Sequence, residues 1–206
     1  MQIELWLIRH GRTPGNACGR YVGRTDEGLE TEEEKRLEDV RRTRTYPEKP
    51  VVCVSPMKRC RQTAAVLFPG ETQYEIGGLQ ECDFGEFEYK NYEELNSRPD
   101  YQAWIDSGGV SGFPGGESLD AFCRRVTAAF EKMVNAVIEG QLPCKQQLAL
   151  VCHGGTIMAV MAAFGWPHRD YFSWQVSNGC GYRVILDTER WSAGEQRLIL
   201  QSEVTV

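Results

Sequence analysis

Leu7-Ile8-Arg9-His10-Gly11 and Val151-Cys152-His153-Gly154-Gly155 are the two stretches that decide the fold of this chain. In each of them, an apolar run carries a histidine into a glycine turn, and an apolar run that ends at a turn is typical of a buried strand. We therefore expect His10 and His153 just beyond the carboxyl ends of two strands. Open α/β sheets bind their ligands at that edge. The chain has three histidines, and two of them share this position.

The composition is typical of one globular domain. The 206 residues are 41% hydrophobic and 25% charged, and a chain of this length buries about 70% of its unfolded surface. The net charge of -6 argues against nucleic acid as the main partner. We find neither an apolar run of the length that a bilayer requires nor a signal peptide, so we expect a cytoplasmic protein that does not bind membranes. The oligomeric state stays open.

Eight cysteines are present, and no two of them form a CxxC pair. Zinc sites usually contain closely spaced ligands, so we expect no metal. Cys53 and Cys152 lie inside apolar runs, where a thiol behaves as a small hydrophobic side chain. We therefore expect reduced and mostly buried thiols, although a cysteine nucleophile is an alternative. Cys60 and Cys82 are candidates for oxidation because they flank residues assigned to the site below.

Strand-like and helix-like segments alternate along the chain. We expect strands at 3–8, 51–54, 74–76, 148–152, 181–186 and 197–202, and helices at 29–45, 55–68, 118–139 and 156–164. Ser55 and Pro56 are expected to open the second helix as its N-cap and first residue. The alternation predicts a single α/β domain over residues 1–206: a three-layer α/β/α sandwich with a mainly parallel mixed sheet. Residues 82–117 are expected to be irregular and to form a lid-like insertion.

Two arginines accompany the two histidines. Arg9 precedes His10, and Arg59 lies in the first turn of the helix expected at 55–68. A guanidinium offers a fork of donors that matches phosphate, and a helix start favours anions. These residues suggest a phosphoryl group held beside a nucleophilic imidazole. The leaving alkoxide then needs a proton donor, for which Glu81 is the candidate.

Four elements in this order make a resemblance specific. They are Arg9-His10-Gly11, then Ser55-Pro56-Met57-Lys58-Arg59, then Leu79-Gln80-Glu81 with Phe84-Gly85, and finally His153-Gly154. Together they resemble the histidine phosphatase superfamily, also called the phosphoglycerate-mutase-like family, over nearly the whole chain. A single Arg-His-Gly triplet arises by chance, whereas four elements in order are a strong signal.

The resemblance implies a role for each site residue. His10 is implied to be the nucleophile that becomes phosphohistidine, and Glu81 to be the general acid and later the base that activates water. The implied phosphoryl-binding residues, which also stabilise the transition state, are Arg9, Arg59 and His153. Asn16 and Gly154 are implied substrate contacts. No cofactor and no metal are implied.

Elementary chemistry adds two requirements for His10. The ring must be neutral to attack phosphorus, so we expect a backbone acceptor to fix its other nitrogen. Nearby positive charge lowers the pKa of a histidine and keeps it neutral. Preplaced arginines meet the charge that develops on the transferred oxygens.

Some positions have a plainer interpretation. Glu81 competes with Asp83, Glu86 and Glu88 in an acidic loop, and only its place in the motif selects it. His168 follows a helix end, so we interpret it as structural or solvent-facing. Arg12 replaces the Glu or Gln that usually follows this triplet in the family. It adds a cation that favours multiply charged substrates, although solvation is the plainer interpretation.

Three functions remain open at this stage. The leading one is a phosphomonoesterase acting on a small phosphorylated metabolite, and a cofactor-dependent phosphoglycerate mutase with the same site is the enzyme alternative. Mutases of the family are longer in the segment that corresponds to 82–117, which favours hydrolysis here. Phe113-Pro114-Gly115-Gly116-Glu117-Ser118 and Tyr101–Trp104 resemble the α-ribazole phosphatase branch and broad-specificity phosphatases. A catalytically silent binding module is the third function, and the intact site residues argue against it.

Overall fold

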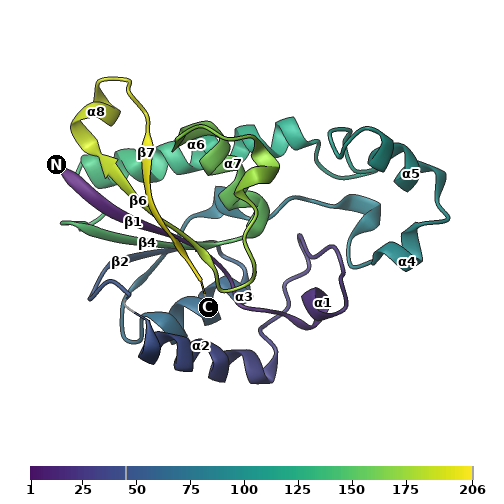
Figure 1. The fold of residues 1–206 in the computed structure, drawn as a ribbon, viewed down its shortest axis with the longest axis horizontal. Helices are drawn as coiled ribbons and strands as arrows, with labels where there is room; N and C mark the ends of the chain where they lie inside the picture. Colours follow the sequence, from purple (N-terminus) through teal and green to yellow (C-terminus); the bar gives the residue numbers. More distant parts are fainter. Residues whose placement is uncertain (45, 206) are drawn as a thin grey trace.

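A mixed sheet lies between layers of helices in the computed structural model, which describes residues 1–44 and 46–205 (Figure 1). In chain order the strands are β1 (Gln2–Arg9), β2 (Val51–Val54), β3 (Gln73–Glu75), β4 (Gln147–Cys152), β5 (Gly165–Trp166), β6 (Gly181–Asp187) and β7 (Leu198–Val204). Within these described residues the spatial order is β3-β2-β4-β1-β6-β7-β5.

The three central parallel strands carry the site. Strand β4 pairs in parallel with both β1 and β2, and β3 extends this parallel part. Strand β6 runs antiparallel to β1, and β7 runs antiparallel to β6. The predicted mixed and mainly parallel sheet is therefore confirmed. Because Arg9 pairs with Cys152 in register, His10 and His153 leave the sheet side by side.

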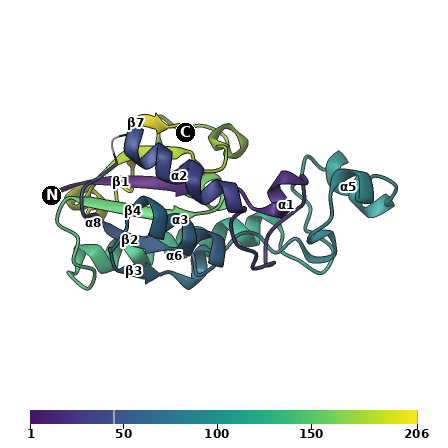
Figure 2. The same cartoon turned by 90° about the horizontal axis from the view of Figure 1, so that it is seen from below.

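Helices cover both faces of the sheet. Their bounds are α1 (Pro14–Ala17), α2 (Thr31–Thr43), α3 (Lys58–Leu67), α4 (Tyr92–Leu95), α5 (Pro99–Asp106), α6 (Leu119–Ile138), α7 (Gly154–Phe164) and α8 (Thr188–Ser192). Helices α2 and α3 lie on one face, and α6 and α7 on the other, which confirms the three-layer sandwich (Figure 1). Figure 2 shows α5 projecting far beyond the edge of the sheet. In the part of the chain that is described, no helix is both long and apolar enough to cross a bilayer.

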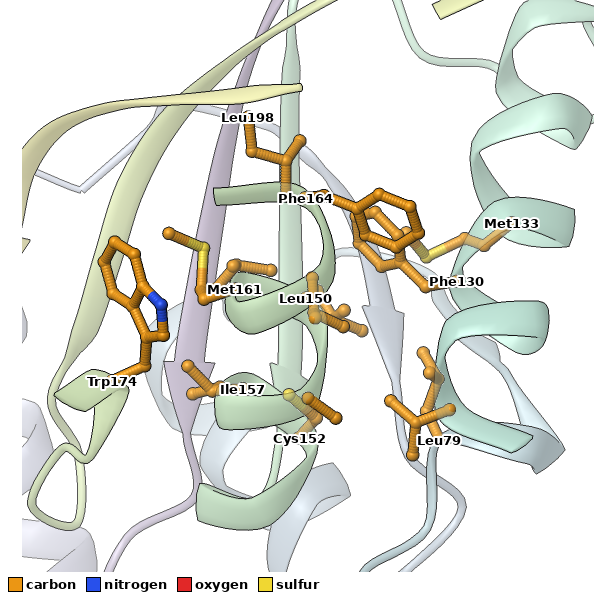
Figure 3. Close-up of a cluster of buried hydrophobic side chains, with 14 of the residues drawn as sticks. Leu79, Phe130, Met133, Leu150, Cys152, Ile157, Met161, Phe164, Trp174 and Leu198 are labelled. Atoms are coloured by element: carbon orange, nitrogen blue, oxygen red, sulfur yellow. The ribbon is translucent and has the colours of Figure 1, made fainter. Parts of the chain in front are cut away.

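Alternate side chains of each central strand face opposite layers. In β1, Leu5 and Leu7 belong to the core under α6 and α7, whereas Trp6 and Ile8 pack toward α3. Side chains that alternate with period two and are buried on both faces are typical of such a sheet. Figure 3 shows the larger core, to which β4 contributes Leu150 and Cys152, α6 contributes Phe130 and Met133, and α7 contributes Ile157 and Met161.

Several predicted boundaries were wrong. Helix α3 begins at Lys58 with Met57 as N-cap, so Ser55 and Pro56 lie outside it. Helix α7 begins at Gly154, two residues before the prediction. The helix expected at 29–45 is α2, and position 45 lies outside the described residues. Two short helices, α4 and α5, also interrupt residues 82–117, which we expected to be irregular.

Candidate active site

His10 is a buried, neutral imidazole at the end of β1. It is 3% exposed, and its Nδ1 lies 2.7 Å from the carbonyl oxygen of Gly11. A carbonyl only accepts, so Nδ1 carries the proton and Nε2 keeps its lone pair. Arg59 Nε donates to this Nε2 at 3.3 Å. Burial, reinforced by the charges of Arg59 and Arg9, holds the pKa of His10 well below its ordinary value. Both requirements derived for a nucleophilic histidine are met.

His153 lies beside His10, at the end of the neighbouring strand. The ring centroids are 5.2 Å apart in an edge-on arrangement. Its Nε2 lies 2.7 Å from Ser55 Oγ, and Cys60 Sγ approaches the same nitrogen at 3.6 Å. Burial, followed by the charge of Arg59, holds the pKa of His153 well below its ordinary value. The serine that we predicted to be a helix cap is therefore a partner of this imidazole. It follows β2, so it reaches the same edge of the sheet.

Two buried guanidinium groups flank the imidazoles. Arg59 is fully buried, and its Nη1 and Nη2 donate to the carbonyl oxygens of Thr25 and Gly23 at 2.8 and 2.9 Å. Arg9 Nη1 donates to Val176 O at 2.8 Å, while its buried Nε has no partner. Among the described residues, neither guanidinium has a carboxylate oxygen within 4.0 Å. Burial also lowers the pKa of Arg9. Glu81 acts on Arg9 as a more distant negative charge. Cations shielded from water without a carboxylate in contact are costly, so this place is suited to an anion.

Glu81 reaches the same edge from another direction. It follows the 3₁₀ turn Gly77–Leu79, and its Oε2 accepts from the N–H of Gly155 at 3.0 Å, in the first turn of α7. Its Oε1 accepts from the N–H of Cys82 at 3.0 Å. A Cβ at Gly155 would lie 2.3 Å from Glu81 Oε1, so this glycine makes room for the carboxyl group.

The three competing carboxylates are engaged elsewhere. Asp83 pairs with Arg24 at 2.8 Å, and Glu86 pairs with Arg98 at 2.7 Å. Glu88 accepts from the backbone N–H groups of Gly23 and Thr25. Of the four acidic residues, Glu81 alone lines the cavity that also contains Arg9.

Asn16 and Gly154 lie in different surroundings. Gly154 is the first residue of α7, and a Cβ there would lie 3.4 Å from Arg9 Cζ. Asn16 Oδ1 accepts from Asn178 Nδ2 at 3.1 Å, and Asn16 does not line the cavities described below. Its contact with phosphate stays a prediction. Asn178 was missed by sequence reasoning, although it also donates to the carbonyl oxygen of His10 at 3.1 Å.

Two cavities meet at Glu81. One, of about 330 Å³, is mostly apolar and has seven aromatic lining residues, and Arg9 and Glu81 are its only charged lining residues in the described chain. We call it the aromatic cavity; its walls include Tyr21, Phe84, Trp104, Phe113, Phe122 and Phe172. The other, also about 330 Å³, is polar and is lined by Gly23, Arg24, Met57, Gln80, Glu81, Glu117 and Arg125. Phe122 belongs to α6, whereas the other aromatic walls come from loops, a short 3₁₀ turn and residues 82–117, where no periodic pattern marked them.

None of the eight cysteines forms a disulfide, and four of them are buried. All eight are free thiols, and Cys60 is completely buried. Burial raises the pKa of the Cys60 thiol to about 12, and burial also raises the pKa of Cys82. A thiol that stays protonated is a poor nucleophile and is slow to oxidise, which argues against both reactive roles considered for these cysteines. Residues 1–44 and 46–205 contain no group of three His, Cys, Asp or Glu side chains placed to hold a metal ion.

Known proteins are similar to this chain in both sequence and fold. An adenosylcobalamin/α-ribazole phosphatase of Salmonella typhimurium is 28% identical over 86% of this chain and 88% of its own length. A broad-specificity phosphatase of Saccharomyces cerevisiae is 30% identical over 77% of this chain and 69% of its own. The crystal structure of the α-ribazole phosphatase of Shigella flexneri has a TM-score of 0.80 at 23% identity, over 100% of this chain and 96% of that one.

A mutase is also among the similar structures. A phosphoglycerate mutase from Thermus thermophilus has a TM-score of 0.66 at 29% identity and covers 99% of both chains. Residues 5–197 match the profile of the histidine phosphatase superfamily (branch 1). With this match over most of its length, the chain belongs to the histidine phosphatase superfamily.

Proposed function

We propose that this chain hydrolyses a phosphomonoester by way of a phosphohistidine on His10. The observation that carries the proposal is the neutral imidazole of His10 between two buried guanidinium groups that lack a carboxylate partner. A phosphate ester supplies the missing negative charge and an electrophile in one group. The unpartnered Nε of Arg9 is a donor ready for a phosphoryl oxygen.

The first step moves the phosphoryl group to the protein. The lone pair of His10 Nε2 attacks phosphorus, and the bond from phosphorus to the ester oxygen breaks. Glu81, as the general acid, gives a proton to the departing alkoxide. The positive charge that forms on the imidazole is stabilised by the Nδ1–H bond to Gly11 O. Arg9, Arg59 and His153 meet the charge on the transferred oxygens, the kind of stabilisation that is usually largest in such reactions.

The second step returns the protein to its starting state. Water attacks the phosphohistidine, the bond from phosphorus to Nε2 breaks, and Glu81 takes the proton of the water. Inorganic phosphate leaves, and His10 is neutral again. No metal ion is needed, because the arginines and Glu81 supply the charge and the proton.

The aromatic cavity favours an uncharged, planar leaving group. It adjoins Arg9 and Glu81, where the ester oxygen would leave, and aromatic walls bind flat rings well. α-Ribazole phosphate, the phosphate of an aromatic N-riboside, has this character, and relatives named for α-ribazole support it as substrate. A phosphoglycerate would place its carboxylate among aromatic side chains. Arg12 does not change this, because it pairs with Glu30 and does not line the cavity.

A substrate screen tests the proposal. Phosphate release is measured for aromatic N-riboside 5′-phosphates, sugar phosphates and phosphoglycerates, with His10→Ala as the blank. We expect kcat/KM to be at least about 10-fold higher for the aromatic ribosides, as an extra apolar contact typically provides. Isomerisation of phosphoglycerate that outpaces phosphate release would establish a mutase instead. Phosphate release that survives His10→Ala would overturn the mechanism.

A further inference from the structure

The side chain of Arg125 forms hydrogen bonds to the backbone at and just before Glu81. This arginine lies on α6, and its Nη1 donates to the carbonyl oxygens of Gly78 and Gln80 at 2.9 and 3.1 Å. Its Nη2 donates to the carbonyl oxygen of Glu81 itself at 3.3 Å. One guanidinium therefore holds three carbonyl groups within four consecutive residues. The planar and rigid fork of arginine is suited to such a task, and the single ammonium of lysine is not.

Glu117 binds both Arg125 and the backbone of Asp83, which follows Glu81 by two residues. Its carboxylate accepts from Arg125 Nε at 2.8 Å and from Nη2 at 2.7 Å, a bidentate ion pair. The same carboxylate accepts from the backbone N–H of Asp83 at 3.0 Å, and Glu117 N donates to Asp83 O at 2.9 Å. Because both side chains are mostly buried, at 30% and 19% exposed, solvent screens this pair less than an exposed one.

The segment held in this way is anchored in the core by Leu79, which is fully buried and whose carbonyl oxygen accepts from Thr156 Oγ1 at 3.3 Å. Gly77 and Gly78 before it have no side chain to pack, and Arg125 binds the carbonyl groups on both sides of Leu79. Gly78 lies directly against α6, where a Cβ would come within 2.5 Å of the Ala129 Cβ. The Glu81 carboxyl group makes its own bonds to backbone N–H groups at Gly155 and Cys82. Its position relative to His10 therefore depends on where the backbone of residues 78–83 is held.

We propose that Arg125, paired with Glu117, is a positioning residue that sets the location of the Glu81 carboxyl group for proton transfer. The inference rests on the proposed role of Glu81 as proton donor. Arg125 acts on the reaction through Glu81, because it lines the polar cavity and is absent from the walls of the aromatic cavity. Misplacement of a reacting group by about 1 Å costs on the order of 100-fold in rate.

Leaving-group dependence separates positioning from general stability. Arg125→Lys keeps the charge and removes the fork, and Glu117→Gln keeps the shape and removes the ion pair. We expect either variant to lower kcat for an alkyl phosphate by about 10–100-fold, with a smaller loss for p-nitrophenyl phosphate, whose leaving group needs no proton. KM should stay within about twofold, because neither residue belongs to the phosphoryl-binding set.

The neighbouring arginine provides the matched control. Arg124 lies one position earlier on α6, is 73% exposed and pairs with Asp120. Arg124→Lys should leave both rates unchanged. Urea unfolding of each variant, followed by tryptophan fluorescence, measures any loss of stability separately from the kinetic readout.

A double-mutant cycle with Glu81→Gln decides the matter. If Arg125 acts through Glu81, adding Arg125→Lys to Glu81→Gln lowers the alkyl phosphate rate no further. A loss that persists in the Glu81→Gln background, or an equal loss for both leaving groups, would overturn the positioning role and leave the proposed function intact. If Arg125→Lys does not fold, Glu117→Gln in the same cycle gives the answer. An unchanged alkyl phosphate rate in Glu81→Gln alone would instead remove the proton donor from the proposed function, and this inference with it.

Discussion

The phosphoryl-binding centre and the aromatic cavity share Arg9 and Glu81 but are built in opposite ways. In the centre, His10, Arg59 and His153 are buried at strand ends and a helix start, and each has a fixed polar partner. The walls of the cavity come from residues 82–117, from other peripheral segments and from α6, which contributes Phe122, and Phe172 among them is 58% exposed. We therefore propose that the sheet specifies the chemistry and that the peripheral segments specify the substrate. Substitutions in the two regions should separate along the same line.

Removal of the nucleophile should have the largest effect. His10→Ala deletes the attacking nitrogen, so turnover should fall at least about 10⁴-fold on every substrate, whatever its leaving group. Initial rates on alkyl and aryl phosphates measure the loss. Phosphate label on the unsubstituted protein should be acid-labile and base-stable, as phosphohistidine is. His168→Ala is the control, because this third histidine is exposed. Retention of activity on small substrates would contradict the division of roles.

Glu81 belongs to both regions, so its effect should depend on the substrate. Glu81→Gln keeps the size and removes the transferable proton, and general acid catalysis is worth about 10²–10⁴ in rate. We expect that loss for alkyl phosphates and a smaller one for p-nitrophenyl phosphate. Glu86→Gln is the control, since Glu86 is exposed and paired with Arg98. Equal losses for both substrates would assign Glu81 a binding or structural role, and a larger loss for Asp83→Asn would move the acid there.

The burial of the centre should make stability depend on pH. The pKa values of His10 and His153 are lowered by burial in the folded protein, so the unfolded chain binds more protons at acid pH. The free energy of unfolding that these neutral histidines contribute is fully present above the unfolded pKa of about 6.5. It is lost as the pH falls below that value, by about 1.4 kcal/mol per pH unit for each histidine.

Urea unfolding between pH 7.5 and 5 measures this dependence. His153→Gln should reduce the slope of the unfolding free energy against pH by about 1.4 kcal/mol per pH unit, the contribution of one histidine. His168→Gln should leave the slope unchanged. An identical slope in His153→Gln would mean that this imidazole is not kept neutral by the fold.

The aromatic cavity should show the smallest and most selective effect. Phe172→Ala removes an exposed wall, so stability should change little, while kcat/KM for aromatic N-riboside phosphates should fall about 10-fold. Small alkyl phosphates should react as before. Tyr92→Ala is the control, because Tyr92 is similarly exposed, at 60%, and does not line the cavity. A uniform loss across substrates would show that the two regions are coupled.

The same division explains what could be predicted from the sequence. The strand-end pattern placed His10 and His153 together, because parallel neighbouring strands must end at one edge. The same pattern applies to Ser55 after β2, but a serine followed by proline is also a helix-start signal, and the wrong interpretation was chosen. Phe122 lies on the predicted helix α6, but the other aromatic walls could not be placed, since they depend on how residues 82–117 and the loops pack and have no periodic signal.

Hydrogen-bond partners that lie far apart in the sequence could not be predicted either. The sequence predicted the helix at 118–139, which is α6, but the backbone carbonyls that Arg125 binds lie more than forty residues earlier in the chain. Asn178, which bonds to the carbonyl oxygen of His10, follows no motif and is 168 positions from its partner. Such contacts depend on tertiary packing rather than on local sequence preference.

The position of β1 has a consequence for biosynthesis. This apolar strand leaves the ribosome well before its two neighbours, which are β4 at Gln147–Cys152 and β6 at Gly181–Asp187. At about 5–20 residues per second, β1 waits on the order of 10 s for a partner. The loop after it waits longer, because Asn178 and Gly179 hold the His10 carbonyl group. We expect the nascent chain to need chaperone protection of this strand, and the nucleophile to be assembled only after residues 178 and 179 have been made.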